Sequence, residues 1–312
     1  MAFVFFHGIE QQDKKADELR MLWIDSIRVG LDRAGSKNPL PLQEWVVMPY
    51  YGDLLARLTP AVSQQIDNVG NARDATARIE GDEPSRQHVP SATMQQLLGE
   101  IRSANGDSRA PQVDVGEQTH RGFKNNVLGA LSNVVPIAAQ NQIVSRVLRQ
   151  VAAYLDDVSL KRAILEIASS AIREGANASE AGNEPLIVVA HSLGSVIALE
   201  ALADFRGKRV DLLMTIGSPL CIETVASRMN PNARRWPETV RKWVNIADPN
   251  DVVALHHSID RRNFLKNCPD RDPAAVWNII DIKNHMDNHH GIAGYLDDPV
   301  VAQLLTDVKL WL

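Results

Sequence analysis

The stretch Pro185-Leu-Ile-Val-Val-Ala-His-Ser-Leu-Gly-Ser-Val-Ile-Ala-Leu199 determines the fold expected of this chain. Its first part, up to Ala190, is apolar without interruption, which is typical of a strand buried on both faces of a parallel sheet. Its last part has apolar residues at helical spacing, which predicts an amphipathic helix. A sharp turn between the two elements would hold the hydroxyl of Ser192 clear of the sheet.

Small residues flank Ser192 at the two positions where a turn of this kind has no room for a large side chain. Ala190 lies two residues before it and Gly194 two residues after it, and both positions pack closely in a turn of this kind. The helix after Ser192 points its free amides and its positive dipole end at the hydroxyl. We therefore interpret Ser192 as a nucleophile, supported by the intervening residues His191 and Leu193. The alternative is that Ser192 only caps the helix.

Apolar runs on both sides of this stretch extend it into an α/β protein. Besides 186–190, the predicted strands are residues 2–6, 44–48, 212–216, 243–247 and 276–282. The predicted helices are residues 16–34, 94–98, 143–155, 159–174, 195–205 and 300–312. Because strands alternate with helices, we expect a mainly parallel, doubly wound sheet of about six strands.

The turn around Ser192 and its flanking elements resemble the nucleophile elbow of the α/β-hydrolase superfamily, the serine esterases and lipases. The resemblance covers most of the chain outside one insertion, with Ala190 where the family pattern has glycine. It implies an α/β-hydrolase fold with a helical cap. The pair His7-Gly8 resembles the motif that follows the third strand of this fold, which implies that the usual first hairpin is absent.

The insertion interrupts the alternation of strands and helices. We assign residues 1–53 and 143–312 to the α/β-hydrolase core and residues 54–142 to a cap or lid; the alternative is a solvated decoration. Within it, the apolar segment 127–139 is too short to span a bilayer. It is a candidate cover for an acyl pocket, or a surface for transient membrane contact.

Two aspartates compete for the role of the catalytic acid, which the resemblance places after strand 243–247. The segment Asp251-Val-Val-Ala-Leu looks like the aspartate segment of lipases similar to the fungal class, so we favour Asp251. Asp248 precedes a proline and suits the opening of a turn, and it remains the alternative. The acid would accept the ring N–H of a histidine and stabilise the imidazolium.

Three histidines compete for the role of the base, which the resemblance places after the last strand. His290 precedes a Gly-Ile-Ala-Gly-Tyr-Leu stretch that resembles the histidine loops of esterases, so we favour it over His289 and His285. With Asp281 and Asp287 these histidines also resemble a metal cluster. The segment has no His-Glu-x-x-His pattern, however, and the nucleophile needs a histidine here. We therefore expect no metal and no cofactor.

Two backbone amides are expected to bind the oxyanion of the tetrahedral intermediate. Gly8 has no Cβ and lets the backbone approach the substrate. By resemblance to hydrolases with a His-Gly motif, the donors would be the amides of Ile9 and Leu193. The alternative is that His7-Gly8 forms an ordinary tight turn.

Composition limits the function classes. The chain has 312 residues, a net charge of -5 and 45% hydrophobic residues, as in an ordinary packed globule. The slight acidity makes nucleic acid a poor candidate partner. With only Cys221 and Cys268 and no signal-peptide pattern at the N-terminus, we expect a cytoplasmic protein.

These observations predict a serine hydrolase that cleaves a carboxylic ester, with a lipid-like acyl ester as the favoured substrate class. An amidase, a peptidase or an acyltransferase would use the same residues. A catalytically silent hydrolase fold that serves binding or signalling is the alternative from another class. The sequence identifies no regulatory partner.

Overall fold

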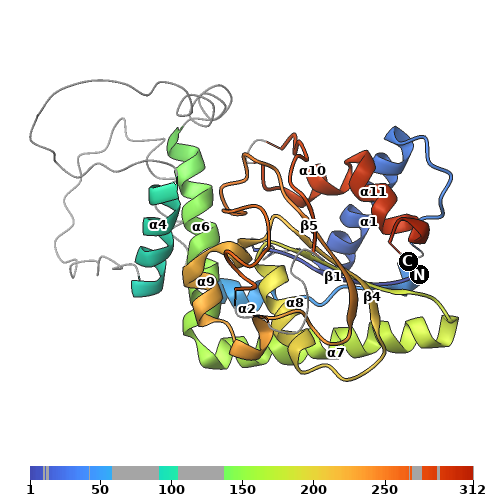
Figure 1. Ribbon diagram of the computed structural model, residues 1–312, viewed down its shortest axis with the longest axis horizontal. Coiled ribbons are helices and arrows are strands. Elements are labelled where there is room, and N and C mark those ends of the chain that lie inside the picture. Colours follow the sequence, from blue (N-terminus) through green and yellow to red (C-terminus); the bar gives the residue numbers. More distant parts are fainter. Residues whose placement is uncertain are drawn as a thin grey trace, which may run out of the picture.

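A computed structural model of the chain describes residues 1–9, 11, 14–41, 43–57, 91–104, 137–266, 268, 276–286 and 289–311, with the backbone alone for 137–146. Most of the predicted cap, including residues 127–136 of its apolar segment, lies outside these ranges, as does Asp287. The described residues form an α/β structure in which helices cover both faces of one parallel sheet (Figure 1).

Six strands make up the sheet within the described ranges, and all pair in parallel. They are β1 (Ala2–Phe6), β2 (Val46–Val47), β3 (Leu186–His191), β4 (Val210–Ile216), β5 (Val240–Ile246) and β6 (Trp277–Ile279), in the spatial order β2-β1-β3-β4-β5-β6. Each predicted run overlaps one strand, which confirms the parallel α/β class, although β4 and β5 begin two and three residues before the predicted runs 212–216 and 243–247. The runs 44–48 and 276–282 are shorter than predicted. Both strands lie at sheet edges, where only one side offers backbone partners.

Alternation along β3 explains its uninterrupted apolar sequence. Leu186, Val188 and Ala190 pack into one hydrophobic cluster, and Ile187 and Val189 pack into the other. Successive side chains of a strand point to opposite faces, so a strand covered on both sides has no polar face. The end of this central strand is therefore held rigidly from both sides.

The described helices divide between the two faces of the sheet. They are α1 (Ala16–Arg33), α2 (Gly52–Arg57), α4 (Ala92–Ala104), α6 (Ile137–Asp156), α7 (Val158–Gly182), α8 (Leu193–Ala203), α9 (Glu223–Arg228), α10 (Ile292–Leu296) and α11 (Pro299–Thr306). Helices α1, α10 and α11 lie on one side, and α7 and α8 lie on the other (Figure 1). The prediction of a doubly wound arrangement is thus confirmed.

Aspartates cap new elements at two places, one at the predicted break between helices 143–155 and 159–174 and one inside the predicted helix 300–312. Asp157 separates α6 from α7, and its carboxylate accepts from the amides of Ser159 and Leu160, both at 2.9 Å. The predicted helix 300–312 stops at Thr306, where Asp307 begins the 3-10 turn η5 (Val308–Leu310). The carboxylate of Asp307 accepts from the amide of Lys309 at 3.1 Å.

Helix α8, which follows Ser192, is not amphipathic as predicted. Every residue from Leu193 to Leu202 is buried, because α7, the sheet and the 3-10 turns η2 (Pro219–Cys221) and η3 (Pro231–Ala233) pack against the helix. Its one buried carboxylate, Glu200, pairs with Lys161 at 2.6 Å and accepts from the hydroxyl of Tyr154 at 2.5 Å. A helix buried all round is a central core element.

Helix α4 falls within the predicted cap and packs against α6 and α9. Glu100 of α4 accepts from the amides of Glu223 and Thr224, both at 2.8 Å, and so caps the first turn of α9. Arg228 of α9 donates to the hydroxyl of Thr93 at 2.8 Å. This part of the insertion is therefore bonded to the core, and α6 runs across the predicted boundary at residue 142.

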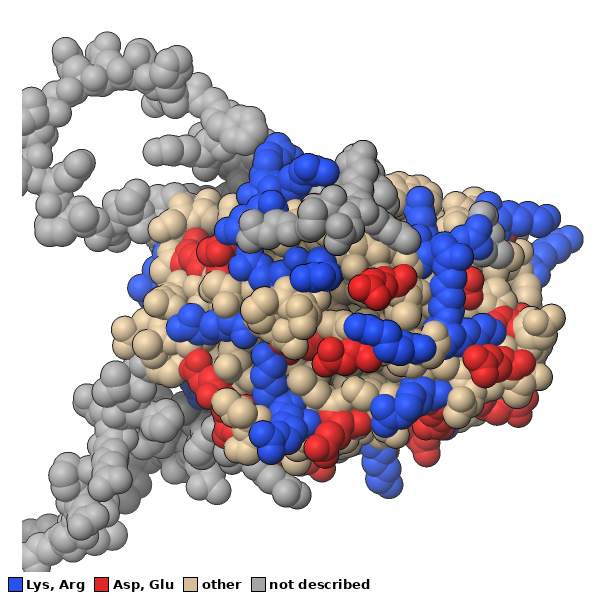
Figure 2. Space-filling model, turned by 60° about the horizontal axis from the view of Figure 1, so that its bottom comes forward, with Lys and Arg blue, Asp and Glu red and all other residues tan. Residues whose placement is uncertain are grey.

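Lys and Arg side chains alternate with Asp and Glu side chains on the face that includes α7 (Figure 2). Along α7, Arg162, Glu166, Arg173 and Glu174 follow this mixed pattern. None of the helices in the described ranges combines the length and the apolar character needed to cross a membrane.

Candidate active site

Ser192 occupies a strained turn between β3 and α8. Its backbone has φ 53° and ψ −129°, a conformation that L-residues other than glycine rarely adopt. Its N–H donates to the carbonyl of Ile216 at the end of β4, at 3.0 Å. The side chain makes no capping hydrogen bond to α8, so the interpretation of Ser192 as a helix cap is wrong. Instead, Ser192 Oγ lies 2.9 Å from His290 Nε2.

The neighbours of Ser192 are small because backbone packs against them. A Cβ on Gly194 would lie 2.4 Å from the carbonyl oxygen of Phe6 and 2.6 Å from that of His7. A Cβ on Gly8 would lie 2.9 Å from the Cβ of Ser192. The end of β1 therefore sits directly against the turn, as the sequence predicts for Gly194. Ala190 is buried in the core beneath it.

His290 lies between Ser192 and Asp251. Its Nδ1 donates to Asp251 Oδ2 at 2.8 Å, which leaves Nε2 to accept from Ser192 Oγ. The other carboxylate oxygen of Asp251 accepts from the amides of Val253 at 2.9 Å and Ala254 at 3.3 Å. Burial opposes ionisation of Asp251, but His290 and the surrounding hydrogen bonds outweigh it and lower the pKa of this carboxyl. The three favoured residues thus form one continuous series of hydrogen bonds.

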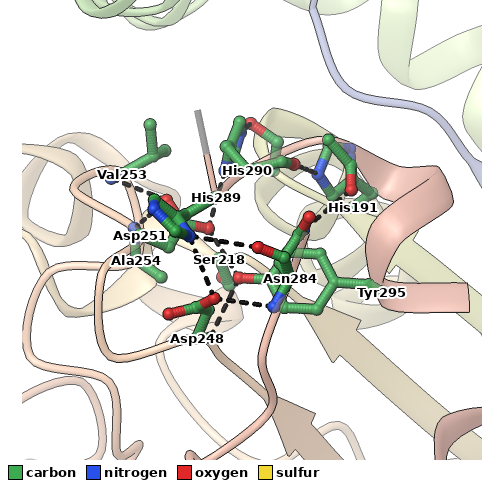
Figure 3. A network of polar contacts seen from close by, with 12 residues as sticks. His191, Ser218, Asp248, Asp251, Val253, Ala254, Asn284, His289, His290 and Tyr295 are labelled. Carbon is green, nitrogen blue, oxygen red and sulfur yellow. Dashed lines mark hydrogen bonds and ion pairs between the residues drawn. The ribbon is translucent and has the colours of Figure 1, made fainter. Parts of the chain in front are cut away.

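The alternative residues Asp248 and His289 form a second pair in the same two loops (Figure 3). His289 Nδ1 lies 3.4 Å from Asp248 Oδ2 and bonds to the carbonyl of Asn284 at 3.0 Å. Asp248 accepts from the amides of Asn250 at 2.6 Å and Asn284 at 2.7 Å. These contacts tie the histidine loop to the acid loop through the backbone.

His285, the third candidate base, lies farther out. Its Nε2 is 3.6 Å from Asp297 Oδ2, and its side chain is 55% exposed. Among the residues that the structure describes, no three His, Cys, Asp or Glu side chains cluster closely enough to hold a metal ion. The three histidines therefore lie beside three different aspartates.

Two further histidines surround the site in neutral form. His191 donates from Nε2 to the carbonyl of His290 at 2.8 Å, and the two rings lie 4.8 Å apart (Figure 3). Burial, reinforced by the nearby His290, lowers the pKa of His191 to about 3. His7 stacks on Tyr51 at 4.0 Å, and burial lowers the pKa of His7 to about 4. His191 thus holds the backbone of the residue that contacts Ser192.

The expected oxyanion donors flank Ser192 from two elements. Leu193 is the first residue of α8, so its amide belongs to the free N–H groups of the helix start. Ile9 follows Gly8 in the loop that packs on Ser192. Ser192 itself has no exposed surface, and Ile9 is 7% exposed. The binding of an oxyanion by these amides stays a prediction.

Two residues of the site were not identified from the sequence. Gly217 has φ +54°, and a Cβ there would lie 2.9 Å from Asp251 Oδ2 and 3.2 Å from His290 Nδ1. Its signal was its place directly after the apolar run 212–216. Tyr295 donates to Asp251 Oδ2 at 2.8 Å. Its signal was an aromatic hydroxyl in an apolar segment, because a buried tyrosine usually bonds to a polar partner.

The fold and the site together define an α/β protein with a serine, a histidine and an aspartate in hydrogen-bonded series at the end of a parallel sheet. Comparisons of the chain with protein-family models, with curated proteins and with solved structures found no match. The function is therefore inferred from the geometry around Ser192.

Proposed function

We propose that the chain is a serine hydrolase with the α/β-hydrolase fold and that Ser192, His290 and Asp251 are its catalytic triad. The observation that carries this proposal is the pair of hydrogen bonds in series, 2.9 Å from Ser192 Oγ to His290 Nε2 and 2.8 Å from His290 Nδ1 to Asp251 Oδ2. Such a series turns a weakly acidic hydroxyl into a nucleophile. The strained backbone of Ser192 supports the same role.

The mechanism follows from the atoms in this series. Ser192 Oγ attacks the carbonyl carbon of the ester while His290 Nε2 takes its proton, and Asp251 stabilises the resulting imidazolium. The amides of Ile9 and Leu193 bind the oxyanion, each contributing about 3 kcal/mol to transition-state stabilisation. His290 then protonates the departing alcohol. A water molecule, deprotonated by the same nitrogen, then attacks the acyl-enzyme and forms a second tetrahedral intermediate. When this intermediate collapses, the carboxylic acid leaves and Ser192 Oγ regains its proton from His290.

The substrate class is proposed as a carboxylic ester with a lipid-like acyl group. The lipid preference depends on the resemblance to lipases and on the apolar segment 127–139, of which residues 127–136 lie outside the described ranges. Amides and acyl transfer remain alternatives, since the same three residues serve all of these reactions. No step of the mechanism uses a metal or a cofactor.

A fluorophosphonate probe tests the proposal, because it modifies only a serine activated by a base and an oxyanion site. We expect intact-mass analysis to show one adduct on the native chain and none on Ser192→Ala. As a control, Ser26→Ala in α1 removes a hydroxyl that bonds to the carbonyl of Leu22 and should leave labelling unchanged. A native chain that stays unlabelled both in buffer and with detergent would contradict the proposal and favour a silent binding module.

Substrate panels then separate the alternatives within the enzyme class. Nitrophenyl esters of increasing acyl length should be hydrolysed, with longer chains preferred, and the matched anilides should react far more slowly. Hydrolysis limited to short acyl chains would remove the lipid-like assignment. Faster reaction with anilides would replace the esterase by an amidase.

A further inference from the structure

The hydroxyl of Tyr295 lies between the two loops that carry the His–Asp pairs. Tyr295 belongs to α10 and is fully buried. Its Oη accepts from the backbone N–H of Asp248 at 3.0 Å and donates to Asp251 Oδ2 at 2.8 Å (Figure 3). A backbone amide is always a donor, so the one hydroxyl proton of Tyr295 is free for the carboxylate.

The oxygen that Tyr295 contacts is the same oxygen that His290 contacts. Asp251 Oδ2 accepts from Tyr295 Oη and from His290 Nδ1, each at 2.8 Å. Asp251 Oδ1 accepts from two backbone amides, those of Val253 and Ala254. Donors on both oxygens prevent the carboxylate from rotating. A hydrogen bond to a carboxylate oxygen also draws negative charge away from its other partners.

We propose that Tyr295 is a positioning residue of the active site, which fixes the Asp251 carboxylate and reduces the negative charge that Asp251 presents to His290. This inference rests on the proposed function. Tyr295 would act through Asp251 and would not touch the substrate, since its hydroxyl is occupied by the amide of Asp248 and the carboxylate of Asp251. Its loss should therefore change kcat and the pH profile and leave KM unchanged.

The ionisable groups around Asp251 determine how the pH profile is interpreted. The groups that face it are His290, Tyr295, Asp248, His191 and His257. Burial, together with the charge of Asp251, raises the pKa of Tyr295, so its hydroxyl stays a donor. Burial lowers the pKa of His191 to about 3, and it also lowers the pKa of His257. His290 is the one of these groups that contacts Ser192, so we assign the acid limb of kcat/KM to it.

The test compares Tyr295→Phe with Tyr154→Phe. Tyr154 is also fully buried and donates to a buried carboxylate, Glu200, at 2.5 Å, but it lies on α6 away from Ser192. For Tyr295→Phe we expect kcat to fall about tenfold, the rate equivalent of one hydrogen bond to a charged group. Its acid limb should move to higher pH, because Asp251 then stabilises the imidazolium more strongly. Tyr154→Phe should change neither.

A second substitution at residue 295 keeps the inference testable if Tyr295→Phe does not fold. Replacement of Tyr295 by 3-fluorotyrosine keeps the hydroxyl and makes it a stronger donor, so the acid limb should move to lower pH. In the uninhibited enzyme, the proton NMR signal of the His290–Asp251 hydrogen bond should move in opposite directions in the two variants. Opposite shifts support the inference, whereas equal shifts, or equal effects of Tyr295→Phe and Tyr154→Phe, overturn it. Failure of the native chain to react with the fluorophosphonate would instead overturn the proposed function.

Discussion

His290 with Asp251 and His289 with Asp248 are two His–Asp pairs built from the same two loops, and only one of them reaches Ser192. The N–O distance is 2.8 Å in the first pair and 3.4 Å in the second, and the histidine side chains are 8% and 28% exposed. His289 has φ +52°, so the chain turns between the adjacent histidines and their rings point to different partners. Residue type and order are the same in both pairs. The two imidazoles differ in direction, because that of His290 faces Ser192 and that of His289 faces Asp248 and the carbonyl of Asn284.

The largest expected difference is between the two histidines. His290→Ala should lower kcat/KM about 10⁴-fold or more, because Ser192 loses the group that takes its proton. His289→Ala and His285→Ala should lower it less than about tenfold, since neither ring contacts Ser192 in this arrangement. Ester kinetics on all three variants, with melting temperatures as the control for folding, check this. Equal losses at His289 and His290 would contradict the assignment of the base.

The two aspartates should differ in the kind of damage that their loss causes. Asp251→Asn should lower kcat about 10⁴-fold, because the carboxamide favours the wrong tautomer of His290. The carboxylate of Asp248 accepts from the backbone amides of Asn250 and Asn284, one on each oxygen. In Asp248→Asn, the new NH2 group replaces one of these oxygens and faces an amide that is also a donor. An unsatisfied buried donor costs about 1–3 kcal/mol of stability. Urea unfolding and ester kinetics on both variants compare the loss of stability with the loss of turnover. An Asp248→Asn variant that is as stable as the native chain but has no turnover would assign the catalytic role to Asp248.

Much of the fold follows from local sequence, and the exceptions have a common cause. The run before Ala190 predicts β3 because burial on both faces removes polar residues from a central strand. The lengths of β2 and β6 depend on how far the neighbouring strand extends, which is tertiary information. The burial of α8 depends likewise on other elements, α7, η2 and η3, that pack on it. Periodicity therefore located the elements, and packing set the lengths of the edge strands and the burial of α8.

The site was predictable to the level of its loops. The turn at Ser192 has local requirements at residues 190 and 194, so sequence alone identified it. Asp248 and Asp251 share one turn, and only the path of the histidine loop decides which carboxylate meets His290. Tyr295 escaped notice because its partner Asp251 lies 44 residues away in the chain. Contacts of this length have no local pattern.

Gly217 offers a way to disturb one pair and spare the other. In Gly217→Ala the new Cβ would crowd Asp251 Oδ2 at 2.9 Å, and the backbone has φ +54°. We expect kcat to fall about 100-fold, the effect of displacing reacting groups by about 1 Å. The matched control is Gly35→Ala, with φ +61° and open space around it, which should cost only about 1 kcal/mol of stability. If Gly217→Ala keeps full turnover as Gly35→Ala does, catalysis does not require the close approach of residue 217 to Asp251 and His290.

The smallest expected effect concerns His191, which contacts the backbone carbonyl of His290. Its pKa is lowered from 6.5 to about 3, so the unfolded chain takes up a proton that the folded chain refuses. Stability is therefore fully present above pH 6.5 and falls toward pH 3, at about 1.4 kcal/mol per pH unit. His7, lowered to about 4, adds a second such contribution. His191→Gln should remove about half of the combined slope in urea unfolding between pH 6 and 5. An unchanged slope would mean that His191 takes up its proton in the folded state.

The complete burial of Ser192 has a kinetic consequence for every covalent reagent. A molecule would reach its hydroxyl only after residues around it are displaced, so we expect labelling to be a gated reaction. At low reagent concentration the observed rate is the intrinsic reactivity multiplied by the open fraction. At high concentration it levels off at the opening rate. The plateau would then be the same for reagents of different chemistry, which makes the labelling curve a measurement of the protein's own motion.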